Sequence, residues 1–178
     1  MGTVHPCITP PVAEWIGRQH MFTVATAPLG AHGHVNVSPK GLDSLRILDE
    51  MTLAYLDHTG SGAETIAHVR ENGRITLMWS AFEGPPRIVR VHGRGEVLGV
   101  DDPRVDGLFQ RGPGARAVIL VRADRVSDSC GYSVPLYEYV GQRTKLTEWA
   151  AARSPEAIAA YWRAKNATSI DGLPALAD

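Results

Sequence analysis

The sequence feature that most constrains the fold is a two-residue alternation over residues 87–98. Val89, Val91 and Val97 fall on one side of a strand there, and most positions between them carry charged or imidazole side chains. Successive side chains of a β-strand point to opposite sides of the sheet, so this segment has an apolar and a polar face. The alternation is typical of an antiparallel sheet that is exposed to water on one side.

Five further segments have the composition of strands. They are rich in β-branched and aromatic residues and are bounded by Gly, Pro or polar turns. These segments are residues 21–27, 34–38, 52–57, 74–82 and 115–126. The last segment is apolar on both faces, which predicts a strand that is covered on both sides.

Segments with helical periodicity and capping residues lie before, between and after these strands. Helices are expected at residues 10–20, 63–72, 102–110, 145–153 and 155–166. The apolar stripe Ile158, Tyr161 and Trp162 on the last helix packs either on the barrel or on a second subunit. Six strands with one helix after the third suit a small closed or partly closed antiparallel barrel better than a parallel α/β sheet.

The chain of 178 residues is long enough to bury a continuous core as one domain. We expect residues 1–178 to form a single domain, with a barrel over residues 10–126 and a helical extension over residues 127–178. The tail, residues 169–178, is expected to be extended.

Composition excludes several classes of protein. With 18 basic and 19 acidic side chains, the chain lacks the positive field that nucleic-acid binding uses. No apolar segment is long enough to cross a bilayer. Cys7 and Cys130 are too few for a disulfide framework and lack metal-type spacing. We therefore expect a cytoplasmic protein with no nucleic-acid or membrane partner.

The segment over residues 55–70 runs from a strand through a Gly and Ser turn into a helix. A helix start offers unpaired backbone N–H groups and a partial positive charge, so Ser61, Gly62 and Thr65 could hold a phosphate there. The alternative is that these residues form only a turn and a helix cap.

Polar residues also follow the strand near residue 36. Val35 and Val37 are expected to point into the core, whereas His34, Asn36 and Ser38 point to the other face, which carries polar chemistry.

This strand should end, or lie at a sheet edge, at Pro39, which lacks a backbone donor. Backbone groups of Val37 and Ser38 are then free for a ligand, and Lys40 could face an anionic group. The alternative is a solvated strand end with a surface lysine.

Metal and hydrolase sites are not supported. His32 and His34 have no acidic or cysteine partner at a supporting spacing. The sequence contains no G-x-S-x-G elbow, and the run from Gly93 to Gly95 lies inside a strand, where no dinucleotide-binding loop forms. No metal site and no catalytic side chain is assigned.

The order of these segments resembles a known family across residues 10–98. The matching segments are MFTVATAP, HVNVSPKG, TLAYLDHTGSGAETIAHVRENGRITLMW and GPPRIVRVHGRGEVL. They look like those of the pyridoxamine 5'-phosphate oxidase-like FMN-binding proteins. The resemblance implies a mainly β fold with flanking helices, a six-stranded antiparallel split β-barrel, and a homodimer with FMN at its interface.

The resemblance also implies roles for particular residues. The residues expected beside the flavin ring are Val37, Ser38 and Lys40, and those expected in the pocket wall are Tyr55 and Leu56. The residues expected at the phosphate are Ser61, Gly62 and Thr65. Members that oxidise pyridoxamine phosphate carry Ser-Arg-Lys at the phosphate turn, whereas this chain has no cation there. We expect backbone N–H groups and hydroxyls to hold the phosphate, aided by Arg70, Arg87 or Arg90.

The implied function is an FMN-dependent oxidoreductase that acts on an unidentified small molecule. Pyridoxamine 5'-phosphate itself is not the expected substrate, since the C-terminal Trp and Arg signature for that molecule is not recognisable. Two alternatives remain open. One is a non-catalytic, deazaflavin-binding or haem-binding module on the same barrel, and the other is a structural protein without a small ligand.

Overall fold

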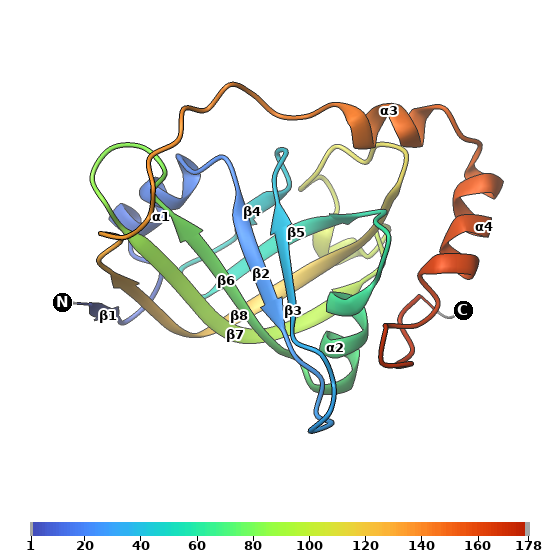
Figure 1. Ribbon diagram of the computed structural model, residues 1–178, viewed down its shortest axis with the longest axis horizontal. Coiled ribbons are helices and arrows are strands. Elements are labelled where there is room, and N and C mark those ends of the chain that lie inside the picture. Colours follow the sequence, from blue (N-terminus) through green and yellow to red (C-terminus); the bar gives the residue numbers. More distant parts are fainter. Residues whose placement is uncertain (1, 177–178) are drawn as a thin grey trace.

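The computed structural model of the chain describes residues 2–176, which form one curled antiparallel sheet flanked by helices (Figure 1). The strands are β1 (Thr3–His5), β2 (Phe22–Thr26), β3 (Asn36–Lys40), β4 (Leu45–Ile47), β5 (Thr52–His58), β6 (Arg74–Ser80), β7 (Ile88–Leu98) and β8 (Ala115–Ser129). Their order is β3-β2-β6-β7-β8-β5-β4, and β1 pairs with β8.

The mainly β, split-barrel fold is confirmed, but the expected number of strands is wrong. The sheet has eight strands instead of six. The two missed strands, β1 and β4, have three residues each, which is too short for an alternation to be recognised in the sequence.

The helices are α1 (Pro10–Gly17), α2 (Glu64–Asn72), α3 (Lys145–Ala151) and α4 (Pro155–Lys165). The helix expected at residues 102–110 is wrong, because only the 3-10 turn Pro103–Val105 forms there, capped by the Asp102 side chain. Gly73 adopts a left-handed conformation that ends α2 just before β6, which agrees with the helix end expected at residue 72. Within residues 2–176, every helix is too short or too polar to span a membrane.

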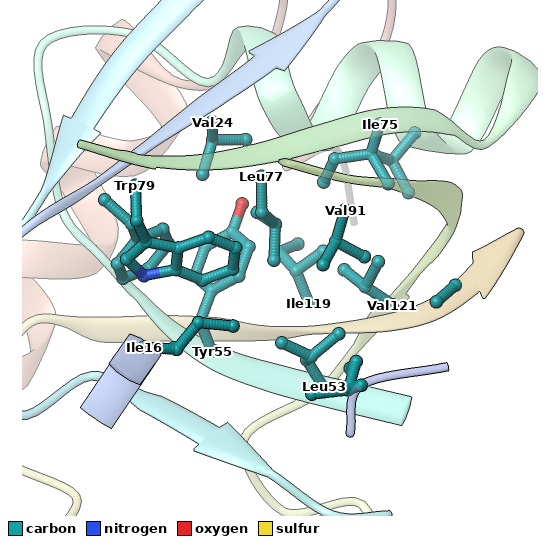
Figure 2. Close-up of a cluster of buried hydrophobic side chains, with 14 of the residues drawn as sticks. Ile16, Val24, Leu53, Tyr55, Ile75, Leu77, Trp79, Val91, Ile119 and Val121 are labelled. Atoms are coloured by element: carbon teal, nitrogen blue, oxygen red, sulfur yellow. The ribbon is translucent and has the colours of Figure 1, made fainter. Parts of the chain in front are cut away.

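The main core lies on the concave side of the curled sheet. Figure 2 shows Leu53 and Tyr55 of β5 in one layer with side chains from α1, β6, β7 and β8. Val89 and Val91 are fully buried there, as the alternation of residues 87–98 predicts.

Strand β8 is covered on both faces, as predicted from its composition. Ile119 and Val121 belong to the main core. Val118 points to the other face, where it packs with Leu98 and Val105 in a second buried cluster. This strand therefore joins the two apolar clusters of the sheet.

The expected direction of the β3 side chains is wrong. The exposed fractions of Val35 and Val37 are 69% and 64%. Ser38 lies directly opposite Val24, which is fully buried, and opposed residues of an antiparallel pair share a face. The polar side chains of β3 therefore face inward, whereas Val37 and Val35, which lies just before the strand, are exposed at the edge of the sheet.

The chain after β8 runs along one side of the sheet to α3 and α4, orange to red in Figure 1. Trp162 donates from Nε1 to Oγ1 of Thr59 at 2.8 Å, so α4 packs on the barrel. The tail is not extended, because the amide of Ala175 donates to the carbonyl of Ala167 and closes a turn. Residues 177–178 of the expected extended tail lie outside the described residues.

Candidate functional site

A groove of about 1510 Å³ opens between the inner face of β3 and the chain that follows β8. Its other walls are the turn after β5, the end of α1, the loop over residues 82–87 and the segment over residues 137–146. Small-molecule sites typically have volumes of roughly 300–1,000 Å³, so the groove has room for a cofactor and a second molecule.

Six of the residues expected at a cofactor line this groove, namely Ser38, Lys40, Leu56, Ser61, Gly62 and Thr65. Two others do not. The Val37 side chain points to the opposite face of β3. Tyr55 is fully buried in the core, where it makes an edge contact with Phe22.

The turn over residues 60–63 presents its backbone in a fixed orientation. The Gly60 carbonyl accepts a hydrogen bond from Asn166 at 3.1 Å, and the Gly62 carbonyl accepts one from Arg116 at 2.9 Å. Within residues 2–176, no acceptor pairs with the N–H groups of residues 60–63. Ala63, the N-cap of α2, provides no side-chain cap. The turn thus has two carbonyls fixed by hydrogen bonds, and the N–H groups of residues 60–63 have no acceptor within residues 2–176.

Arg116 supplies the cation that the sequence of the turn lacks. Its side chain is only 5% exposed and lines the groove beside Gly60. Nε donates to Asp57 at 2.6 Å and Nη1 donates to Gly62 and Asn166. Within the described part of the chain Nη2 has no acceptor, so this nitrogen is available to an anion at the turn.

Of the three arginines considered from the sequence, Arg70 and Arg90 do not line the groove, and Arg87 lines it with its guanidinium paired to an aspartate. Arg70 donates to the carbonyl of Ala175. Arg87 pairs with Asp128 at 2.8 Å, and Arg90 donates to Ser129. The sequence around Arg116 gives little indication of its place at the turn, because it shows only a charged residue at the start of an apolar strand. Its partner Asp57 is 59 residues away in the sequence.

Asp57 is a buried carboxylate between two cations. Lys40 Nζ lies 2.8 Å from Oδ1, and Arg116 Nε lies 2.6 Å from Oδ2. Burial raises the pKa of this carboxyl, but the charges and hydrogen bonds of Lys40 and Arg116 outweigh burial and hold the pKa below its ordinary value. The ionised triad carries one net positive charge at the wall of the groove.

A hydrogen-bonded network fixes the polar face of β3. Asn36 donates from Nδ2 to the hydroxyls of Thr26 and Thr65 at 3.1 and 3.0 Å. Ser38 donates to Oδ1 of Asn36 at 2.8 Å, and Nδ1 of His68 lies 3.0 Å from the Thr26 hydroxyl. The network ties β3 to α2 and gives the groove a preorganised polar wall.

The segment over residues 137–146 forms the opposite wall, which sequence reasoning missed. Tyr139 stacks on His20 with ring centroids 3.5 Å apart. Gln142 accepts from the amide of Leu42 at 3.0 Å and donates to the His20 carbonyl at 2.9 Å. Irregular structure without periodicity gives no sequence signal for such contacts.

Comparison with known proteins agrees with this architecture. The family described as Pyridoxamine 5'-phosphate oxidase matches residues 8–130. The pyridoxamine 5'-phosphate oxidase family protein ustO of Aspergillus flavus is 40% identical over 185 residues, which cover 92% of this chain and 73% of that protein.

Two solved structures share the fold. HupZ from Group A Streptococcus has a TM-score of 0.51 and 25% identity, covering 67% of this chain and 91% of that chain. The FAD-binding protein from Mycobacterium smegmatis has a TM-score of 0.50 and 8% identity, covering 71% of this chain and 97% of that chain. Since the family match spans strands β2 to β8 and the turn over residues 60–63, the chain belongs to the pyridoxamine 5'-phosphate oxidase family.

Proposed function

We propose that the protein is a cytoplasmic, homodimeric, FMN-dependent oxidoreductase that acts on a small molecule other than pyridoxamine 5'-phosphate. One observation carries this proposal: Gly60, Ser61 and Gly62 line the same large groove as Arg116, and within residues 2–176 their N–H groups and Nη2 of Arg116 have no acceptor. A helix N-terminus combined with an arginine is a favourable environment for a phosphate. A structural relative that binds FAD adds support for a flavin.

The residues of the groove fit FMN. Ser61, Gly62 and Arg116 would hold the phosphate, with Thr65 beneath them in the network with Asn36. Ser38, Lys40 and Leu56 would form the wall beside the ring. When bound, the flavin supplies the electron transfer, and the protein supplies binding, orientation and exclusion of water.

Lys40 has a defined part in this arrangement. Its ammonium is held by Asp57 at 2.8 Å while its side chain remains 20% exposed in the groove. A cation fixed in this way favours anionic substrates and negative charge that develops on a neighbouring group. Phosphate binding, by contrast, is assigned to Arg116 and the turn.

The dimer is supported by the outer face of β3. Val35 and Val37 project from an edge strand whose other side lines the groove. Apolar residues on an exposed edge strand favour pairing with another surface. A second copy of the chain at this edge would cover the valines and lie next to the groove.

The test compares FMN with riboflavin, which lacks the phosphate. Ser61→Asp should weaken FMN binding by about tenfold or more, or about 1.4 kcal/mol, through repulsion between like charges. Riboflavin binding should hardly change. Ser133→Asp, at an exposed serine outside the groove, is the matched control.

Absorbance spectra after reconstitution identify the cofactor class. A flavin spectrum with FMN supports the proposal, whereas selective binding of a deazaflavin or haem, or an unchanged FMN affinity in Ser61→Asp, contradicts it. For turnover, the loaded protein is reduced with dithionite and mixed with a panel of small oxidants. Reoxidation no faster than that of free FMN would exclude an oxidoreductase acting on those compounds.

A further inference from the structure

The segment after residue 130 lies outside the family match. It nevertheless contacts the turn over residues 60–63 in the wall of the groove. Two side chains near the end of α4 make these contacts. Trp162 reaches Thr59, the residue before the turn, and Asn166 reaches Gly60 within it. The turn is therefore held by parts of the chain that the family match does not include.

Asn166 is fully buried and uses both atoms of its amide. Oδ1 accepts from Arg116 Nη1 at 3.0 Å, and Nδ2 donates to the Gly60 carbonyl at 3.1 Å. This assignment is the only one that satisfies both partners, because a guanidinium can only donate and a carbonyl can only accept. An aspartate or a leucine at this position could not make both bonds.

The main chain of Asn166 is itself fixed from two sides. Its N–H donates to the carbonyl of Trp162 at 2.7 Å, and its carbonyl accepts from Leu176 at 3.0 Å. The side chain therefore projects from a rigid position between α4 and the folded-back tail.

Trp162 anchors the residue just before the turn. Its Nε1 donates to the hydroxyl of Thr59 at 2.8 Å, and that hydroxyl donates to the Gly114 carbonyl at 2.8 Å. The amide of Thr59 donates to the same carbonyl at 2.7 Å. The turn thus begins at a residue with little freedom to move.

These bonds also set the direction of Arg116. With Nε on Asp57 and Nη1 shared between Gly62 and Asn166, the planar guanidinium cannot rotate without losing several charge-assisted bonds. The guanidinium orientation is consequently fixed, with Nη2 about 4.0 Å from the Cβ position of Gly60 in the turn.

We propose that Asn166 is a positioning residue of the phosphate end of the groove. It holds the Gly60 carbonyl away from the anion and keeps Arg116 directed at it, with Trp162 in support. This inference rests on the proposed FMN function. It means that the C-terminal extension orients groups of the proposed cofactor site.

The experiment titrates FMN and riboflavin into the full chain and into Asn166→Leu, Asn166→Asp and Trp162→Phe. Asn166→Leu should weaken FMN binding by about tenfold, since both partners lose a buried bond. Asn166→Asp should weaken it further, because the new carboxylate neutralises Arg116. Riboflavin affinity should change by less than about twofold in either variant.

Trp162→Phe removes a single N–H donor and should lower FMN affinity by about threefold. Trp149→Phe is its matched control, because Trp149 also lies in the extension, packs on Tyr161 and is not among the residues that line the groove. The control should keep the wild-type ratio of FMN to riboflavin affinity. Thermal unfolding without ligand reports any general loss of stability, which would weaken both ligands together.

The outcomes separate the two proposals. A wild-type preference for FMN with an unchanged affinity ratio in both Asn166 variants would overturn the positioning role and leave the cofactor proposal intact. If those variants do not fold, an unchanged ratio in Trp162→Phe overturns it. A wild type that binds neither flavin, or binds FMN no better than riboflavin, would overturn the phosphate site and this inference with it.

Discussion

Lys40 and Asp57 form a salt bridge of 2.8 Å between β3 and β5, two strands that are far apart in the order of the sheet. Strand β3 is at one end of that order, and β5 is next to the other end. The bridge therefore joins β3, at one end of the curled sheet, to β5, near its other end, at the wall of the groove. Asp57 therefore links two distant strands of the sheet, and it also balances the charges of Lys40 and Arg116.

Asp57→Asn should lower the free energy of unfolding by at least about 3 kcal/mol, because it leaves two cations facing each other without a buried counter-charge. Denaturant unfolding followed by tryptophan fluorescence measures the change. Asp43→Asn, which removes the exposed partner of Arg46, is the control and should cost less than about 1 kcal/mol. Equal losses in the two variants would contradict the importance of the buried bridge.

The stabilisation by Asp57 should disappear in acid. Its carboxyl has a pKa below the ordinary 3.8 in the folded state, so the unfolded chain takes up a proton first as the pH falls. The difference in stability between wild type and Asp57→Asn should be constant above about pH 5 and shrink as the pH falls through 3.8 and below. A difference that grows in acid would show that the folded state favours the protonated acid.

His58 should make stability depend on pH in a higher range. Burial is the main cause that lowers its pKa below the ordinary 6.5; Asp57 opposes this effect, and Lys40 and Arg116 add to it. Since the unfolded chain protonates first, the stability that His58 contributes is present above pH 6.5 and is lost as the pH falls through the lowered pKa. His58→Asn should reduce the slope of stability against pH between 5 and 7. An unchanged slope would assign it to other histidines, such as His92, whose pKa is also lowered.

Lys40→Ala should affect turnover more than cofactor retention. Arg116 still pairs with Asp57 in this variant, so the fold and the proposed phosphate end of the groove are preserved. We expect turnover to fall by at least about tenfold, while FMN affinity stays within about fivefold of wild type. Parallel steady-state assays and FMN titrations measure the two effects. Equal losses would show that Lys40 is mainly a binding residue.

Val37→Glu should shift the protein from dimer to monomer, because it places a charge on the exposed face of β3. Sedimentation should give about twice the chain mass for the wild type and the single-chain mass for the variant. Val4→Glu changes an exposed valine on β1 and should leave the mass unchanged. A monomeric wild type at micromolar concentration would contradict the dimer.

The sequence was sufficient to predict those parts of the fold that have a local pattern. The alternation of β7 and the passage from β5 through a turn into α2 are both visible in a single stretch of residues. The direction of the β3 side chains could not be predicted in this way, because an alternating pattern separates two faces but does not indicate which face is buried. That choice is made by the pairing of Ser38 with Val24 on another strand.

The cation and the amide at the turn were missed for a related reason. Arg116 lies 54 residues from Gly62 in the sequence, and Asn166 lies 106 residues from Gly60. Neither contact leaves a motif, since no spacing rule connects residues on separate elements. The Gly and Ser turn indicated where an anion could lie, and only the three-dimensional structure indicated which charge accompanies it.

The contact between Gly60 and Asn166 also has a consequence for synthesis. The strands β5 and β8 can pair once residue 122 is available, but the turn acquires its final form only after residue 166 has left the ribosome. A nascent chain therefore passes through a stage in which the sheet can form and the turn over residues 60–63 cannot take its final form. If the protein binds FMN as proposed, loading is expected to follow translation, and a chain that ends within α4 should retain less FMN than the full chain.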